Sequence, residues 1–463
     1  MMRTLALLFT SFLAVAPLLA QDPVVEPAAP EQEEQQEQVA EPEEIPTTDA
    51  DAAVDDEVAQ PMFQNHATVV AEAQTGTRAD SFFNPGGSLY SPSLHSQLFR
   101  INDDLTATLP KDLSLRAKFS LEWSHSGDDR VTRGQVRELF LARSFGDFNV
   151  YAGRRILKWT NGYAFSPAGL LDPPRSPSDP QDRLGRLGGR DLVQADWIRG
   201  DHTATLVYSF PFDTRAGGGE RVLAARYNVL VRGIDLSLLA ALPSQSPARV
   251  AFTFNTVIGQ ALEIHGEASA QRGSDSVHPS SAFTDELRLY GLDYFTDRDD
   301  DDVRIRTLAG ASFTFRDGTN VIAEYYHTDE GLTAAEWSNF NSQARYADSL
   351  RGDPRFVPIQ DGMTLPELNL VQGLSYLRGQ EIQRDYAFLR LSRSFLEGKI
   401  STTALTLVNI HDRSSLVAPE LSYTLRRQTT FYARGVFFFG NDHSQYGNVP
   451  DSRTLTAGIR RHF

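Results

Sequence analysis

An arginine-rich stretch is the part of the sequence with the clearest capacity for chemistry. Residues 156–190 contain five prolines and almost no hydrophobic periodicity, and they include Arg175, Arg183, Arg186 and Arg190. Irregular stretches of this length are uncommon inside compact domains and are usually functional or disordered. Guanidinium groups held beside a narrow passage would attract a passing anion. We therefore predict that this segment folds inward and narrows a pore, with the four arginines at the constriction.

A second interpretation gives the same arginines a structural role. In it, the segment packs outside on its neighbours and the arginines are paired with nearby carboxylates. The available partners are Asp172, Asp179, Asp182 and Asp191. The sequence leaves both interpretations open.

The remaining chemically capable residues form no recognised catalytic or metal site. Asp297, Asp299 and Asp301 have the register of a calcium loop, but the sixth position is Asp302 instead of glycine and the twelfth is Leu308. None of the ten histidines forms a metal-binding pair at helical spacing, and no phosphate loop, nucleophile elbow or zinc signature is present. We expect no metal, no cofactor and no catalytic residue, so the protein is predicted not to be an enzyme.

Long alternating strands must position these side chains. In residues 113–123, apolar side chains alternate with Ser, Arg, Lys and Glu, and residues 262–271 and 303–316 repeat the pattern. Period-two runs are strands with one wet and one apolar face. Nine to thirteen residues is long for a soluble sheet but matches a tilted strand that crosses a bilayer, about nine to eleven residues. The wet faces should place four more cations in a lumen: Arg116, Lys118, Arg304 and Arg306. Four carboxylates should face the same lumen: Glu122, Glu263, Glu267 and Glu324.

The connections predict a closed all-β transmembrane barrel of antiparallel strands. Short turns alternate with longer loops, the first of them expected at Ser124–Gly134, as in outer-membrane barrels. A soluble sandwich or solenoid would not require this alternation. The last strand, Arg453 to Phe463, follows a long loop and must run inward. Counting back requires a first outward strand, best placed at Ala67-Val69-Ala71, which gives about 18 strands. The count becomes 16 or another nearby number if that strand is false or if residues 328–383 hide a hairpin. Within that stretch, Ala334 to Leu350 have helical spacing, which predicts a short helix.

The N-terminus adds two further segments. Residues 1–20 resemble a secretory signal peptide, with a short apolar run after Arg3. Residues 21–60 hold fourteen Asp and Glu but no Lys or Arg, which predicts a disordered acidic segment before the barrel at 61–463. The formal net charge of the whole chain is −16, but the rest of the chain is nearly neutral once the acidic segment is left out. The low pI therefore says little about the partners of the barrel. The chain has no cysteine, so no disulfide stabilises it.

Two stretches resemble known families. The terminal sequence TLTAGIRRHF, ending in Phe463, resembles the C-terminal strand by which the assembly machinery recognises bacterial outer-membrane proteins. Gly153-Arg154, Trp159, Asn161-Gly162, Phe165-Ser166-Pro167, Leu171-Asp172-Pro173, Asp179-Pro180 and Gly189-Arg190 resemble a loop of porin-type barrels. The segment is similar to the alginate-export-like and related uncharacterised transporter families. This resemblance implies a transport function in the bacterial outer membrane.

The sequence therefore predicts a passive, water-filled outer-membrane channel for small or oligomeric hydrophilic solutes, with a lean toward anions. Expected partners are membrane lipid and lipopolysaccharide, the barrel assembly machinery and the solute, without nucleic acid. A homo-trimer is one assembly that the sequence leaves open. The alternatives are a hydrolase built on a barrel, for which His202, His265, His327 and His411 are available, and a plugged structural or adhesive barrel.

The compartment can be tested directly. We expect the mature protein to fractionate with the outer membrane and to migrate faster on gels before boiling than after it, because a closed barrel stays compact in detergent. Recovery in the soluble periplasmic fraction would contradict the barrel.

Overall fold

A computed structural model describes residues 62–463 except 79, 91–92, 111, 212–219, 275, 281–288, 290, 292–293, 298–300, 378–380 and 426–427. The expected signal peptide and acidic segment lie outside the described residues. So do Asp299 and Asp300 of the aspartate run.

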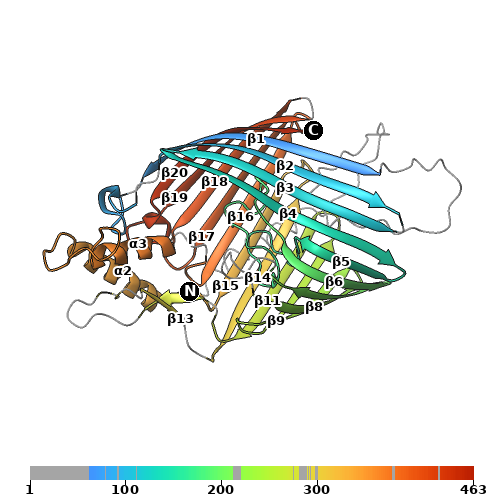
Figure 1. Cartoon of the computed structure of the whole chain (residues 1–463), viewed down its shortest axis with the longest axis horizontal. Helices are drawn as coiled ribbons and strands as arrows, with labels where there is room; N and C mark the ends of the chain where they lie inside the picture. Colours follow the sequence, from blue (N-terminus) through green and yellow to red (C-terminus); the bar gives the residue numbers. More distant parts are fainter. Residues whose placement is uncertain are drawn as a thin grey trace, which may run out of the picture. The chain divides into compact units, whose positions relative to one another are not determined.

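Eighteen strands form one closed antiparallel barrel, as the sequence predicts (Figure 1). The barrel strands are β1 (Phe63–Arg78), β2 (His95–Leu109), β3 (Leu113–Ser126), β4 (Asp129–Phe145), β5 (Phe148–Arg155), β6 (Arg190–Arg199), β7 (His202–Ser209), β8 (Val222–Val231), β9 (Ile234–Pro243), β10 (Arg249–Ile258), β11 (Leu262–Arg272), β14 (Val303–Thr314), β15 (Asn320–Thr328), β16 (Asp385–Phe395), β17 (Ile400–Asn409), β18 (Ser415–Leu425), β19 (Thr429–Phe439) and β20 (Asp451–His462). β1 pairs with β20 from Thr68 opposite His462 to Arg78 opposite Asp451, which closes the ring. The first strand predicted at Ala67 is confirmed.

One predicted connection is wrong. We expected a longer loop at Ser124–Gly134, but β3 and β4 run through it and Ser126 lies directly opposite Asp129. The residues there are polar on both faces, so the alternating pattern that marks the other strands is lost although the ladder continues. The hairpin extends β4 well beyond its pairing with β5, which covers only Leu139 to Phe145.

The outer face of the barrel is apolar. On β3, Phe119 and Leu121 are 39 % and 51 % exposed, while the alternating Arg116 and Lys118 form ion pairs with Asp104. Large exposed apolar side chains recur on nearly every barrel strand, far beyond what a soluble monomer carries. A closed antiparallel barrel with such a surface is the architecture of bacterial outer-membrane proteins, so the lipid face is the outside. No helix among the described residues has the length and apolar character to cross a membrane.

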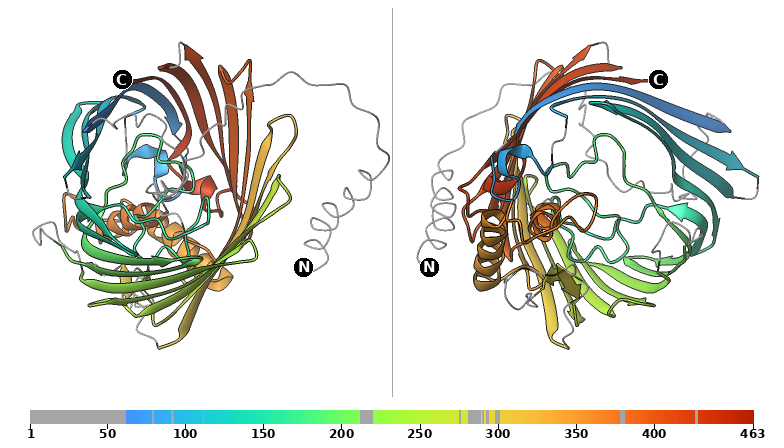
Figure 2. Two further views of the ribbon diagram at one scale, coloured as in Figure 1. Left: turned by 90° about the vertical axis from the view of Figure 1, so that its right-hand side faces the viewer. Right: turned by 60° about the vertical axis from the view of Figure 1, so that its left-hand side comes forward.

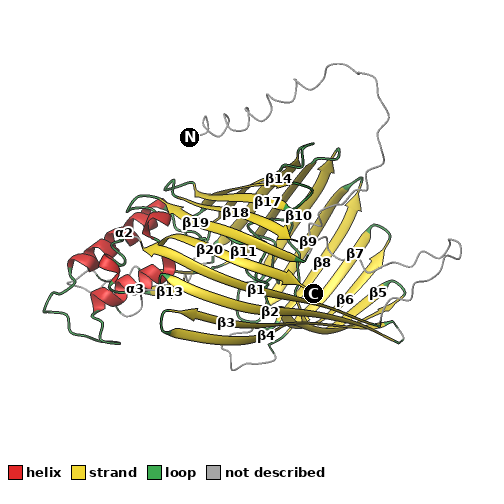
Figure 3. Ribbon diagram, turned by 90° about the horizontal axis from the view of Figure 1, so that it is seen from above, coloured by secondary structure: helices red, strands yellow, loops and turns green. Residues whose placement is uncertain are grey.

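A small core of loops lies at the end of the barrel opposite the short turns (Figure 3). It contains η2 (Pro85–Gly87), the hairpin of β12 (Val277–Pro279) and β13 (Phe295–Asp297), α2 (Ala334–Ser349) and α3 (Leu365–Leu377). The helix predicted at Ala334–Leu350 is confirmed and starts with a capping box between Thr333 and Glu336. The described residues from 329 to 383 therefore hold helices and no barrel strand. A short 3-10 turn, η4 (Tyr446–Asn448), precedes β20.

Two neighbouring residues on β3 test which face meets lipid. Phe119→Arg should lower the free energy of unfolding by about 2–4 kcal/mol if the side chain lies near the bilayer midplane. Lys118→Gln should lower it less, because glutamine keeps a polar side chain toward the interior and loses only the ion pairs with Asp104 and Glu138. Denaturant titration in lipid vesicles would measure both, and equal sensitivity would mean that both faces of β3 are buried in protein.

Candidate functional site

The segment between β5 and β6, residues 156–189 and here called the inner loop, turns into the barrel. It leaves and re-enters the wall at one point, because Arg155 and Arg190 are direct partners in the β5–β6 ladder. Gly153, just before it, has φ +131, and a Cβ there would lie 2.2 Å from the carbonyl oxygen of Leu139. Figure 2 (left) looks along the barrel and shows the inner loop as a green trace inside the ring of strands.

Two carboxylates on the wall hold the first arm of the inner loop. Glu267 on β11 accepts hydrogen bonds from the backbone N–H groups of Asn161 (2.5 Å), Gly162 (2.8 Å) and Ala168 (3.0 Å). It also accepts one from the Thr160 hydroxyl at 2.5 Å.

Glu324 on β15 continues this anchor. Its two oxygens accept from the N–H groups of Tyr163 (2.5 Å) and Ala164 (2.8 Å), and Nε2 of His265 lies 3.0 Å away. An irregular backbone inside a barrel needs such partners, since the ladder supplies none.

A third carboxylate lies within the loop itself. Asp172 accepts from the N–H of Trp159 at 2.8 Å, and its other oxygen lies 3.4 Å from Arg175. Burial raises the pKa of Asp172 to about 6, against the lowering effect of the Trp159 N–H and the Arg175 charge. The ionised carboxylate therefore opposes docking of the loop at neutral pH, and its donors offset part of that cost.

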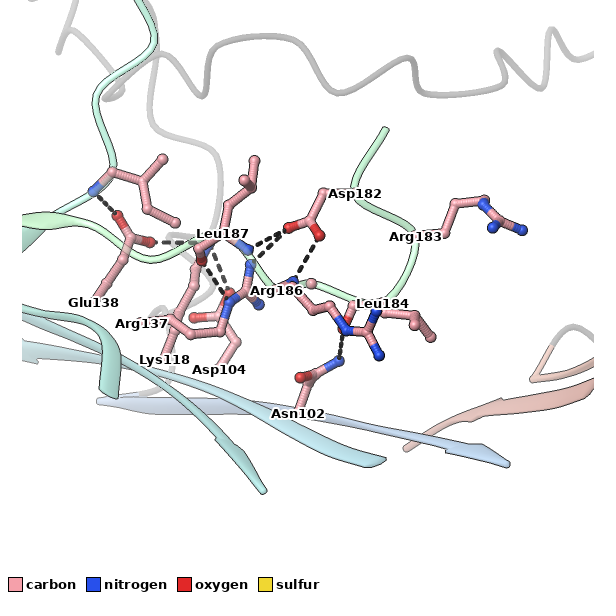
Figure 4. A network of polar contacts seen from close by, with 12 residues as sticks. Asn102, Asp104, Lys118, Arg137, Glu138, Asp182, Arg183, Leu184, Arg186 and Leu187 are labelled. Carbon is pink, nitrogen blue, oxygen red and sulfur yellow. Dashed lines mark hydrogen bonds and ion pairs between the residues drawn. The ribbon is translucent and has the colours of Figure 1, made fainter. Parts of the chain in front are cut away.

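The returning arm is tied to β2 and β4 (Figure 4), and Arg186 ties it to Glu122 on β3. Arg137 donates to the carbonyl of Leu187 at 3.0 Å and lies 3.5 Å from Asp182. Asn102 donates to the carbonyl of Leu184 at 3.0 Å. Glu138 accepts from the N–H of Ile156 at 2.8 Å, at the point where the loop leaves the wall.

The tip of the loop reaches β18, β19 and β20. Arg183 lies 2.5 Å from Glu420 and 2.8 Å from Asp179. Arg434 donates to the carbonyl of Ser178, and Arg460 donates to that of Arg183 at 3.0 Å. The inner loop therefore contacts the wall on several sides of the lumen.

Apolar packing fixes the same loop. Phe165 is 1 % exposed and stacks on Tyr326, with ring centroids 4.4 Å apart, among inward-facing residues of β14 to β18. Leu157, Trp159 and Leu171 pack against Leu192 and other inward-facing residues of β6 to β10. Much of the inner wall is thus apolar and covered, whereas the sequence predicted a wet lining throughout.

The predicted constriction residues differ in their surroundings. Arg175 is 9 % exposed and is held by Asp172 and the carbonyl of Gly162. Arg183 is paired as described above, and Arg186, 53 % exposed, lies 3.2 Å from Glu122. Arg190 is the first residue of β6. The carboxylate pairing proposed in the second interpretation is present for Asp172 and Asp179, but inside the barrel; Asp182 and Asp191 instead pair with Arg137 and Arg154.

The four predicted strand cations lie in two places. Arg116 and Lys118 share Asp104, each at 3.3 Å, and Lys118 also lies 3.2 Å from Glu138. Arg304 lies 3.6 Å from Asp302, and Arg306 stands opposite Thr328 on β15. The structure therefore places Arg183 and Arg186 on the inner loop and Arg116 and Lys118 on the wall beside Asp104. Arg304 and Arg306 lie apart from them, at the β14 end near the outer loops.

Sequence reasoning missed the residues that hold the loop. Glu267 and Glu324 were assigned only to the wet faces, and Arg137 and Glu420 had no role. One signal was present: β9 and β17 carry apolar residues at consecutive positions, such as Leu238-Leu239, which indicates a strand that is apolar on both faces. Leu238 lies on the outer face and Leu239 is buried inside.

The histidines offered for a barrel hydrolase contact tyrosine or carboxylate groups. His202 lies 2.7 Å from the Tyr227 hydroxyl, and His327 and His411 lie 2.7 and 2.6 Å from Asp385. Within the described part of the chain, no group of three or more His, Asp or Glu side chains is arranged to hold a metal ion.

Comparison with known proteins identifies the fold only. No protein-family model and no curated protein sequence matches the chain. Acinetobacter baumannii OccAB1 superposes with a TM-score of 0.52 at 10% identity, covering 86% of this chain and 96% of that one. Pseudomonas aeruginosa OccK5 (OpdH) gives 0.50 at 10% identity, covering 86% and 98%. A mutant porin of Rh. blastica is more distant, with a TM-score of 0.42, 10% identity and coverage of 87% and 100%. The chain has the fold of outer-membrane porin-type barrels.

Phe165 tests the docking of the inner loop. Phe165→Ala should remove about 3–5 kcal/mol of packing free energy. This loss should weaken the docking of the inner loop and leave the pairing of the barrel strands intact. Trypsin should then cut after Arg175 and Arg183 faster than in the parent, while the barrel stays heat-modifiable. Phe315→Ala, at an exposed turn, is the control, and equal protection of Phe165→Ala and the parent would contradict docking through this ring.

Proposed function

We propose that the protein is a passive channel of the bacterial outer membrane for small or oligomeric hydrophilic solutes, with the inner loop as its constriction. The observation that carries this proposal is the inner loop itself, anchored on β11 and β15, on β2 to β4 and on β18 to β20. A loop fixed on several sides of a lumen narrows the passage and leaves the barrel wall unchanged. The porin-type fold supports the same function class.

The charges around the inner loop favour weak selectivity. Arg183, Lys118 and Arg137 each lie near at least one carboxylate, so most of the fixed charge is compensated locally. Of the three arginines within the inner loop, Arg186 is the most exposed, at 53 % against 9 % for Arg175 and 17 % for Arg183. Arg190 is also exposed, but it is the first residue of β6 and belongs to the wall. We propose that selectivity of the channel for anions comes mainly from Arg186, because an exposed charge near a constriction acts on ions in the passage.

We also propose a solute class, an assembly signal, binding partners and two N-terminal segments. The likeness to alginate-export-like transporters would make an oligosaccharide the solute. Phe463, at the end of β20, donates its N–H to the carbonyl of Ala67 at 2.9 Å and is 59 % exposed, which leaves its ring accessible to the assembly machinery. Lipid and lipopolysaccharide contacts, a homo-trimer, a cleaved signal peptide and an acidic segment at residues 21–60 belong to the same proposal.

A plugged structural barrel is the second candidate. The apolar clusters that cover inner wall residues from β6 to β18 favour it, because they fill space that an open porin leaves to water. Single-channel conductance in a planar bilayer separates the two: discrete conducting steps support the channel, and their absence supports the plug. A hydrolase assay on the same sample tests the barrel-enzyme alternative.

Two arginine substitutions test the selectivity. Arg186→Gln should shift the reversal potential in a salt gradient toward cations, because it removes an exposed charge from the passage. Arg175→Gln removes a buried charge that faces Asp172, so it should leave the reversal potential nearly unchanged. Equal shifts for both variants, or none for Arg186→Gln, would mean that the passage does not run beside Arg186.

A further inference from the structure

Glu267 and Glu324 differ from the other residues that hold the inner loop, because they are buried carboxylates whose partners are mainly backbone N–H groups. Both are about 4 % exposed, and both face the inner loop from the middle of the wall. Among the described residues Glu267 has no ion-pair partner, so its charge is stabilised by three backbone N–H groups and one hydroxyl. Glu324 has two backbone donors and the ring of His265.

A buried carboxylate without a cation is costly unless hydrogen bonds satisfy it. Here nearly all of those hydrogen bonds come from residues 160–168 of the inner loop. The dependence is mutual, since the same loop residues have N–H groups that the barrel ladder does not satisfy. Docking of the first arm therefore creates a set of charge-assisted hydrogen bonds, each stronger than a bond between neutral groups.

We infer that Glu267 and Glu324 are the positioning residues that set the bore of the proposed channel, because they fix the first arm of the inner loop against β11 and β15. This inference rests on the proposed function, because only a channel has a bore. The anchoring of the first arm by Glu267 and Glu324, here called the latch, can be measured without transport. The first arm leads directly into Asp172 and the arginine-bearing tip, so its release would move the constriction.

The chemistry explains why glutamate is needed and glutamine would fail. In Glu267, one oxygen accepts from Thr160, Asn161 and Gly162 and the other from Ala168. In Glu324, one oxygen faces Tyr163 and His265 and the other faces Ala164. A glutamine amide keeps only one acceptor oxygen, so in either orientation its NH₂ group would face a loop N–H.

A hidden wall residue can report release of the loop. Thr253 on β10 is fully buried and lies directly opposite Glu267 in the ladder. The chain has no cysteine, so Thr253→Cys introduces the single thiol. Ser338→Cys, at an exposed position of α2, supplies the reference rate. Reaction with a water-soluble dipyridyl disulfide, followed by absorbance, measures how often the wall under the loop becomes accessible.

The variants are Glu267→Gln, Glu324→Gln and the double variant, each combined with Thr253→Cys. Glu263→Gln is the matched control, since Glu263 lies on the same strand and face without a hydrogen bond to the inner loop among the described contacts. Loss of one charge-assisted hydrogen bond should raise the open population about tenfold or more. We therefore expect the thiol to react at least about tenfold faster in the double variant, and no faster in Glu263→Gln.

The outcomes separate the inference from the proposed function. Faster thiol reaction together with larger or noisier single-channel conductance supports both. Faster reaction with unchanged conductance keeps the latch but overturns its control of the bore. Equal protection of the thiol in the parent and the double variant overturns the latch. If the double variant fails to become heat-modifiable, the single variants carry the test, each with an expected rate increase of about tenfold.

Discussion

Satisfaction of backbone polar groups inside the barrel is the constraint on which the rest of the structure depends. A strand meets it through its two neighbours, but the inner loop has no neighbours of that kind. The wall supplies acceptors and donors instead: Glu267 and Glu324 for loop N–H groups, and Asn102, Arg137 and Arg434 for loop carbonyls. Side chains on strands that are far apart in the sequence therefore all form hydrogen bonds with one segment, the inner loop.

Because wall side chains are used to hold the inner loop, the interior of this barrel differs from that of an open pore. In a wide, water-filled pore the inner face is wet and the wall alone carries the stability. Here Leu192 and Val207 on one part of the wall, and Tyr386 and Phe388 on another, are buried beneath the loop. The interior thus resembles the core of a soluble domain along β6 to β18, while the polar network on β2 to β4 and the tip contacts on β18 to β20 keep charged groups inside the barrel. The inner loop thus covers an apolar, packed part of the wall, within which Glu267 and Glu324 are the charged anchors, and it is held by charged groups on the rest of the wall.

The sequence was sufficient for the barrel and insufficient for its interior. Period-two patterning identified β3, β11 and β14, and the alternation of turns and loops led to the strand count, because membrane-facing strands must be apolar on one side along their whole length. The helix at Ala334 was predictable from local spacing. Which lumen groups meet was not, since the partners of Asn161 and Tyr163 lie more than a hundred residues away, at Glu267 and Glu324. The polar hairpin at Ser124–Gly134 was lost for a related reason: above the apolar band, neither face of a strand has to be apolar.

The shared core at the loop end has an evolutionary consequence. Phe83 from the first long connection, Tyr294 from the β12–β13 region and Phe340 from α2 pack in one cluster, so these outer segments cannot change sequence independently. A substitution in one must be matched in another. The hairpin around Gln360 and Met363 is different, because Val357 beside it is 68 % exposed. Surface variation under pressure from phage or antibodies would therefore concentrate on that hairpin, while the segments that share the core would diverge slowly and together.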